Sequence, residues 1–371
     1  MLPYIGLLFT SLFCVWLYDV KRKKSGKLFC YLLLLVYTIL LSGLSYRIGA
    51  DIYNYSNSYD YVPRFSELSW SDLTNSLYPL FLLFCALCRS ISQEFYVLHL
   101  FQSAIICSVI FFFIYRKTQY CFMGVCIFVT LFYSYFCFEI LKESLAVIMV
   151  LLGYDYLDQR KKSKFFLFVM IAILFHPSAF FALILPFIRK IGFDKSFIFG
   201  VACIGGFMIA LSPISGYLSI AENIYDKVQA YADEYRSTKF YIIQIISNVL
   251  IPFLLLVMFK KRDKNFPFEW AFCVYVLCGI GILQYKVIFL RFLNYLLPFL
   301  VIPLSDFFGN YRKSSPKFRL FILGCYIAFT LSRNLVYWYK DGWKIYYPYS
   351  SIFTKMVDIQ RENWMYNFWG Y

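Results

Sequence analysis

Side chains that could act on a substrate occur at few points in a chain otherwise built of apolar runs. The first long polar interval, residues 47–72, begins with Arg47 and Asp51. It cannot span a bilayer, because its charges would lack partners in hydrocarbon. Further charges lie beside or inside later apolar runs, at Glu139, Lys142, Glu143, His176, Lys286 and Arg291. The spacing of Glu139, Lys142 and Glu143 puts them on one side of a helix end.

These residue types suit one kind of reaction. Lysine and arginine stabilise phosphate oxygens, and arginine can bind two of them at once. A carboxylate or an imidazole can take a proton from an attacking hydroxyl group. The chain is also 23% aromatic, and tyrosine and tryptophan present an apolar face with a polar edge that suits sugar rings. The set predicts glycosyl transfer from a lipid diphosphate.

Each residue also has a simpler explanation. Lys142 could form a structural ion pair with Glu139 or Glu143, and His99 is interpreted as a satisfied core residue. Cys85 and Cys88 form a lone CxxC inside an apolar run, which favours packing thiols over metal or redox chemistry. The motifs of soluble hydrolases, nucleotide-binding proteins and zinc enzymes are absent from the sequence.

Composition indicates a polytopic membrane protein. The 371 residues have a mean hydropathy of +0.63 and are only 15% charged, against about 25% in soluble domains. Many apolar runs approach the ~20 residues needed to cross a bilayer. We expect an all-α protein of about 10–12 membrane helices, some broken or half-length, in a single membrane domain over residues 1–371. Residues 1–19 are interpreted as a retained span, because no cleavage site follows them.

The net charge of +15 indicates how the chain is oriented in the membrane and does not indicate a nucleic-acid partner. More than half of the 36 lysines and arginines lie in six clusters between apolar runs, at residues 21–27, 116–117, 160–164, 189–195, 260–264 and 312–319. The positive-inside rule places all six in the cytoplasm. This requires residues 164–188 to form a hairpin broken at Pro177. It also predicts a first periplasmic loop at 47–91 with an interfacial half-helix over 77–91, a second at 215–239 and a periplasmic tail at 338–371.

Five short motifs follow in a fixed order along the chain. They are Arg47-x-Gly49-x-Asp51-x-x-x-Tyr55, Lys142-Glu143-x-x-Ala146, Phe175-His176-x-Ser178-Ala179, Arg291-Phe292-x-x-Tyr295 and Tyr347-Pro348-Tyr349. In order and spacing the chain resembles the EpsG family, Wzy-like polymerases of O-antigen, capsule and exopolysaccharide. It departs from that pattern at Lys142-Glu143, where the family usually shows Arg-Gln. Lysine keeps the charge but loses the two-pronged contact.

The resemblance implies a GT-C-like glycosyltransferase of the bacterial inner membrane that joins undecaprenyl-diphosphate-linked oligosaccharide repeats at the periplasmic face. Arg47 and Arg291 would hold the donor diphosphate, and Asp51, Glu143 or His176 would be the base. The substrate-binding residues would be Tyr55, Glu139, Lys142, Lys286, Tyr295, Tyr347 and Tyr349. We expect no metal and no cofactor. The expected partners are the lipid-linked donor and acceptor, the bilayer and a chain-length regulator protein.

Two other functions remain open at the level of sequence. One is the ligase that transfers finished glycan to the lipid A core, which would share the architecture. The other is a flippase or transporter of lipid-linked sugars. A transporter should show inverted repeats and polar residues that reach both faces, and the sequence shows neither.

The predicted topology can be tested by cysteine labelling in a thiol-free background. We expect His176 and the C-terminus to face the periplasm, and Lys162 and Lys261 to face the cytoplasm. A membrane-impermeant reagent should therefore modify cysteine at position 176 but not at position 162 in intact spheroplasts. Labelling at position 162 would contradict the topology.

Overall fold

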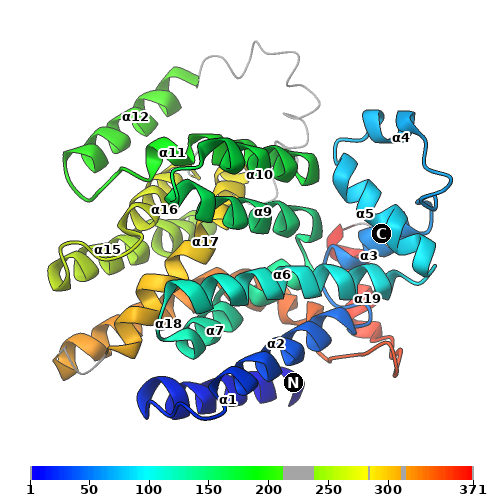
Figure 1. Cartoon of the computed structure of the whole chain (residues 1–371), viewed down its shortest axis with the longest axis horizontal. Coiled ribbons are helices and arrows are strands. Elements are labelled where there is room, and N and C mark those ends of the chain that lie inside the picture. The colour runs from blue at the N-terminus through cyan, green and yellow to red at the C-terminus, as the bar shows by residue number, and fades with distance from the viewer. Residues whose placement is uncertain (1, 212–237, 283–284, 311–314, 370–371) are drawn as a thin grey trace. The chain divides into compact units, whose positions relative to one another are not determined.

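A computed structural model describes residues 2–211, 238–282, 285–310 and 315–369 (Figure 1). These residues fold into helices, and no strand occurs among them; one isolated antiparallel bridge joins Ser45 to Ser351. The chain is therefore all-α, as composition predicts. The second predicted periplasmic loop, 215–239, lies almost entirely outside the described residues.

Five helical segments are long and apolar enough to cross a membrane. They are Leu2–Val20, Phe95–Lys117, Cys121–Phe138, Ile242–Arg262 and Ile288–Gly309. Shorter apolar helices occur at Lys27–Gly43, Pro79–Ile91, Pro177–Ile188, Lys195–Ile204 and Glu269–Gly281. The chain is a multi-pass membrane protein. The expected total of 10–12 membrane helices stays a prediction.

The backbone divides into two compact units. Unit 1 contains residues Met1–Leu183, Leu304–Asn310 and Asn334–Tyr371, and unit 2 contains Ile184–Pro303 and Tyr311–Arg333. The expectation of a single membrane domain, made from composition, stays a prediction.

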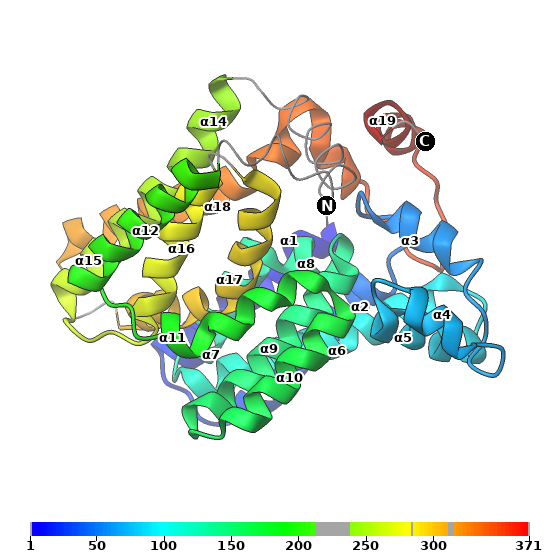
Figure 2. The ribbon, with the colours of Figure 1, turned by 90° about the horizontal axis from the view of Figure 1, so that it is seen from above.

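In unit 1 the helix α6 (Phe95–Lys117) is central. It packs against α2 (Lys27–Gly43), α5 (Pro79–Ile91) and α9 (Leu141–Asp158), and α9 pairs with α10 (Lys162–Phe175) (Figures 1 and 2). The helix α1 (Leu2–Cys14) continues as a π-helical turn and packs against α2 and α7 (Cys121–Phe128). Gly43 of α2 allows the close packing on α6, because a Cβ there would lie 2.8 Å from Leu100.

A break separates α8 (Ser134–Phe138) from α9 at Glu139 and Ile140. Two side chains of α6 bond carbonyl groups just before it. His99 Nε2 donates to the Cys137 carbonyl at 2.7 Å, and Gln102 Nε2 donates to the Phe136 carbonyl at 3.4 Å. His99 is 1% exposed, so it is the satisfied core residue that the sequence suggested. Because buried carbonyls need partners, these bonds stabilise the break.

The polar interval after α2 contains the short helices α3 (Ile52–Tyr59) and α4 (Trp70–Asn75), and α5 follows. α5 has 13 residues, which matches the predicted half-helix; its position at the membrane interface stays a prediction. α10 ends at Phe175, His176 is extended, and a 3₁₀ segment (Pro177–Ile184) follows. The predicted break at Pro177 is therefore present, and the return to the cytoplasm stays a prediction.

The aromatic tail is folded, as its composition predicts. A 3₁₀ turn (Tyr339–Ile345) and the helix α19 (Ile359–Trp369) belong to unit 1. The tail bonds to the turn after α2, where the Tyr46 amide donates to the Ser350 carbonyl at 2.9 Å and the Ile352 amide donates to the Leu44 carbonyl at 3.0 Å. The two ends of the chain are thus joined at the start of the polar interval.

In unit 2 the helix α16 (Glu269–Gly281) is central and packs against α12 (Lys195–Leu211), α14 (Thr238–Ile245) and α15 (Ile251–Arg262). α11 (Leu185–Ile188) begins this unit. Lys260 Nζ contacts both carboxylate oxygens of Glu269, at 2.7 and 2.8 Å. The unit also holds α17 (Lys286–Gly309) as far as Pro303 and α18 (Pro316–Trp338) as far as Arg333.

Gly49 fixes the turn between α2 and α3. Its φ is +110°, and a Cβ atom there would lie 2.1 Å from the carbonyl oxygen of Phe138. Only glycine adopts this conformation without strain and permits this approach. The Arg47-x-Gly49-x-Asp51 spacing therefore has a structural cause. The turn is packed against the end of α8, next to the break before α9.

We expect Gly49→Ala to lower the melting temperature and the yield of folded protein, because it combines left-handed strain of about 1–3 kcal/mol with a clash against backbone. Gly324→Ala is the matched control, since nothing lies within 4 Å of the added methyl group. That change should be neutral or slightly stabilising. Equal melting temperatures for both variants would contradict the role assigned to Gly49.

Candidate functional site

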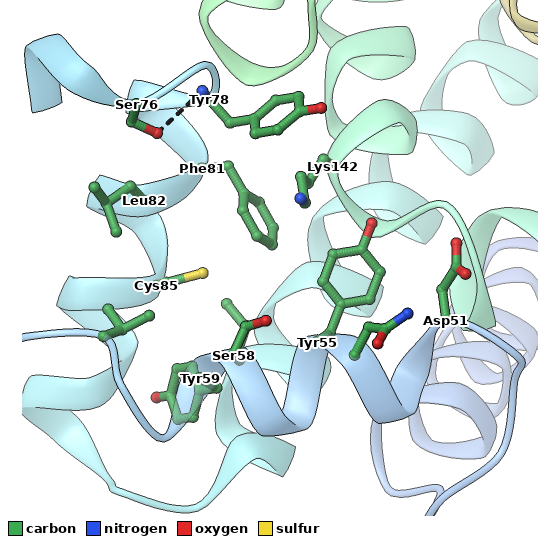
Figure 3. A pocket seen from close by; sticks show the side chains of 13 residues that line it. Asp51, Tyr55, Ser58, Tyr59, Ser76, Tyr78, Phe81, Leu82, Cys85 and Lys142 are labelled. Atoms are coloured by element: carbon green, nitrogen blue, oxygen red, sulfur yellow. Dashed lines mark hydrogen bonds between the residues drawn. The ribbon is translucent and has the colours of Figure 1, made fainter. Parts of the chain in front are cut away.

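A cavity of about 350 Å³ lies in unit 1 between α3, α5 and the start of α9 (Figure 3). This volume is within the range of small-molecule sites. The residues from α3 and its ends recur at helical spacing and so form one face of the helix. They are Asp51, Asn54, Tyr55, Ser58, Tyr59 and Val62. The remaining wall includes Tyr78, Phe81 and Cys85 from α5 and its N-terminal end, together with Lys142 from α9.

Three aromatic rings surround the Lys142 ammonium. Its Nζ lies 4.2 Å from the ring centre of Tyr78, 5.3 Å from that of Tyr55 and 5.6 Å from that of Phe81. Figure 3 shows the lysine pointing toward these rings. Aromatic faces attract a cation within about 6 Å. The rings therefore help to hold the positive charge at the cavity.

His176 adjoins this group through Tyr78. The two rings are stacked with centres 5.5 Å apart and planes at 25°. His176 Nδ1 lies 2.7 Å from Ser178 Oγ, and the Ser178 amide donates to the same nitrogen at 3.2 Å. Accepting that bond requires a lone pair on Nδ1, so a neutral ring would carry its proton on Nε2. The break at Pro177 thus places the imidazole against the ring of Tyr78, which lines the cavity.

Arg47 contacts Glu362 and Tyr53 and does not line the cavity. Its Nη2 lies 2.8 Å from Glu362 Oε2, and its guanidinium carbon is 4.5 Å from the ring centre of Tyr53. Tyr53 donates to the other Glu362 oxygen at 2.6 Å. Burial and then this hydrogen bond raise the pKa of Tyr53 to about 12. Burial disfavours the charge of Arg47, but Tyr53 and Glu362 outweigh it and raise the pKa of Arg47. Both groups keep their protons at neutral pH.

Arg361 joins three backbone segments. Its guanidinium donates to the carbonyl groups of Arg47 (2.9 Å), Lys344 (3.0 Å) and Pro348. The residue is 1% exposed, and burial lowers the pKa of Arg361. Arginine alone has enough donors in a fixed fork for three acceptors. This side chain therefore connects the turn after α2 with the tail.

The other predicted residues of unit 1 are arranged as follows. Glu139 is buried, and one of its carboxylate oxygens accepts from the Tyr346 hydroxyl. Tyr349 donates to the Leu41 carbonyl at 3.1 Å, and Tyr347 packs on Trp343 with ring centres 5.8 Å apart. Glu143 is 1% exposed and does not line the cavity.

Lys286, Arg291 and Tyr295 all belong to α17 in unit 2. Lys286 and Arg291 are partly exposed, and Tyr295 is 1% exposed. Their participation in the same site as Asp51 and Lys142 stays a prediction. In the parts of the chain that the structure describes, no three His, Cys, Asp or Glu side chains form a candidate metal site.

The sequence did not single out the polar cavity residues Asn54 and Ser58, nor five further residues at or near the site. Tyr53, Tyr78 and Phe81 are rings in an aromatic-rich interval, and nothing local distinguishes them from their neighbours. Arg361 and Glu362 lie beyond the last motif, and both contact Arg47, which is more than 300 positions earlier. One signal was available: the three- and four-residue recurrence from Asp51 to Val62 predicts the face of α3 that lines the cavity.

Comparison with known proteins gives one match. The model of the EpsG family matches residues 4–351. No curated protein and no solved structure matches the chain significantly.

Proposed function

The chain belongs to the EpsG family, and from this premise we propose that it is a glycosyltransferase that polymerises oligosaccharide repeats. Its substrates are undecaprenyl-diphosphate-linked repeat units of an O-antigen, capsule or exopolysaccharide. The reaction takes place at the periplasmic face of the bacterial inner membrane. A chain-length regulator would act as a separate protein partner.

One observation carries this proposal. The cavity brings a lysine held by three aromatic rings together with the half-buried carboxylate of Asp51 and with the hydroxyl or amide groups of Asn54, Tyr55 and Ser58. A cation, a carboxylate and aromatic faces suit glycosyl transfer from a sugar diphosphate. This combination distinguishes the cavity from an apolar lipid groove.

The reaction assigns a role to each group. An acceptor hydroxyl attacks the anomeric carbon of the donor, a new C–O bond forms, and the bond from that carbon to the diphosphate breaks. Undecaprenyl diphosphate leaves with the electron pair. Lys142 stabilises the negative charge that develops on the leaving group, and such stabilisation is usually the largest contribution to rate. Tyr55, Tyr78 and Phe81 supply the faces on which a sugar ring can lie.

Asp51 is the base that the cavity favours. It lines the cavity, whereas Glu143 does not, and His176 adjoins it through the ring of Tyr78. The acceptor proton would pass to Asp51, and His176 would orient Tyr78. Arg47, which is paired with Glu362, would support the turn that carries Asp51.

The proposal is tested with purified protein in lipid vesicles and lipid-linked repeat units as the only sugar source. A ladder of lengthening glycans, with release of undecaprenyl diphosphate, is the expected product. Cells that lack the protein should accumulate single repeats on the core. No glycan on the core would indicate the ligase instead, and repeats retained in the cytoplasm would indicate a flippase.

Lys142→Met should reduce the polymerisation rate about ten- to hundredfold, which corresponds to the ~1–3 kcal/mol of one charge-assisted interaction. Lys142→Arg restores the residue usual in the family and should keep most of the activity. Lys162→Met removes an exposed lysine at the start of α10 and serves as the control. Full activity of Lys142→Met would remove this lysine from the site.

Asp51→Asn should leave a folded protein whose polymerisation is slower by about a hundredfold or more, the lower end of the range for loss of a general base. Asp60→Asn is the matched control, since Asp60 ends the same helix, is exposed and does not line the cavity. Rates and melting temperatures of both variants should be measured together. A normal glycan ladder from Asp51→Asn would eliminate Asp51 as the base.

A further inference from the structure

The C-terminal helix α19 contacts the start of α3 through two consecutive charged residues. Arg361 reaches the Arg47 carbonyl, and Glu362 reaches the side chains of Arg47 and Tyr53. Both contacts fall within the seven residues from Arg47 to Tyr53, and Asp51 lies between these two residues. The helix is therefore attached to the segment that carries the candidate base.

The opposite faces of α3 have different partners. Tyr53 contacts Glu362, whereas Asn54, Tyr55 and Ser58 line the cavity. Residues 53 and 55 are two positions apart on a helix and so point in nearly opposite directions. The hydrogen bond that holds Tyr53 therefore also sets the rotation of α3 about its axis. That rotation determines where Tyr55 and Asp51 lie in the cavity.

Glu362 uses both carboxylate oxygens for this purpose. One oxygen pairs with Arg47 at 2.8 Å and the other accepts from Tyr53 at 2.6 Å. These partners lie on either side of Asp51 in the chain. The Glu362 side chain is 28% exposed and that of Arg47 is 40% exposed, so water screens the pair and its contribution to global stability is small. The Glu362–Arg47 pair can still fix the local geometry of α3 without contributing much to the stability of the whole fold.

We propose that Glu362 is a positioning residue of the active site, which sets the orientation of α3 and hence of Asp51 through Arg47 and Tyr53. Arg361 anchors α19 for this purpose by bonding to three carbonyl groups. The inference rests on the proposed function, because it gives α19 a role in polymerisation. In this arrangement Arg47 helps to position Asp51 and does not bind the diphosphate directly.

Glu362→Gln is the informative variant, because Arg361→Lys would leave buried carbonyls unbonded and could prevent folding. Glutamine keeps the shape but lacks the negative charge and one acceptor oxygen, so the charge-assisted bonds to Arg47 and Tyr53 are weakened. We expect kcat to fall about tenfold with KM and melting temperature unchanged, and Glu362→Asp to recover part of the loss. Glu94→Gln is the matched control and should behave as wild type, because Glu94 is exposed, directly precedes α6 and makes no side-chain capping bond.

The decisive measurement places Glu362→Gln in the Asp51→Asn background. If Glu362 acts through Asp51, the second substitution should cause no further loss, because residues that act as a unit are not additive. An equal loss in both backgrounds would show a general structural role and overturn the proposal. Wild-type kcat from Glu362→Gln alone would also overturn it.

Hydrogen exchange of the same variants keeps this test separate from the proposed function. Glu362→Gln should increase backbone exchange in residues 46–59 and leave α9 and α10 unchanged, and Glu94→Gln should change neither region. If the wild-type protein forms no polymer, the proposed function fails. Hydrogen exchange in residues 46–59 still shows whether Glu362 holds α3 in place. Unchanged exchange in residues 46–59 would refute that contact whatever the activity.

Discussion

A buried carbonyl group must find a donor, and this requirement determines the centre of unit 1. The break between α8 and α9 is buried, and Phe136, Cys137 and Phe138 beside it are completely shielded from solvent. His99 and Gln102 bond the carbonyls of Cys137 and Phe136. Without these donors a continuous helix would be favoured, since it satisfies its own backbone. The break makes Lys142 a residue of the first turn of α9, and this turn is what reaches the cavity.

The same break explains how distant segments meet. Gly49 brings the turn after α2 against the Phe138 carbonyl, and Tyr346 bonds to Glu139 within the break. Arg361 then connects that turn to the tail. Residues near positions 50, 140 and 350 thereby form one connected group. Each contact alone is modest, but the buried ones cannot be removed singly without leaving an unbonded polar group.

The electrostatics of the site follow from how its cations are held. Glu362 neutralises Arg47, whereas three rings surround Lys142. Cation–π contacts with these rings favour the charged form of Lys142. Lysine is also a compact charge on a flexible stem, so it can follow a moving leaving group, although it lacks the two-pronged geometry of arginine. The aromatic lining is compatible with lysine at position 142, where the family usually has arginine.

The sequence by itself determined the class of the protein and most of its candidate residues. Its apolar runs and low charge predict membrane helices, Pro177 predicts the break after Phe175, and the spacing from Asp51 to Val62 predicts one face of α3. These features are local, because hydropathy, proline geometry and helical periodicity act over a few residues. Only the tertiary structure decided which of the charges share a cavity. It placed Asp51, Tyr55 and Lys142 together, paired Arg47 with Glu362 and left Glu143 outside the cavity. Such choices depend on contacts between residues far apart in the chain, and no local pattern encodes them.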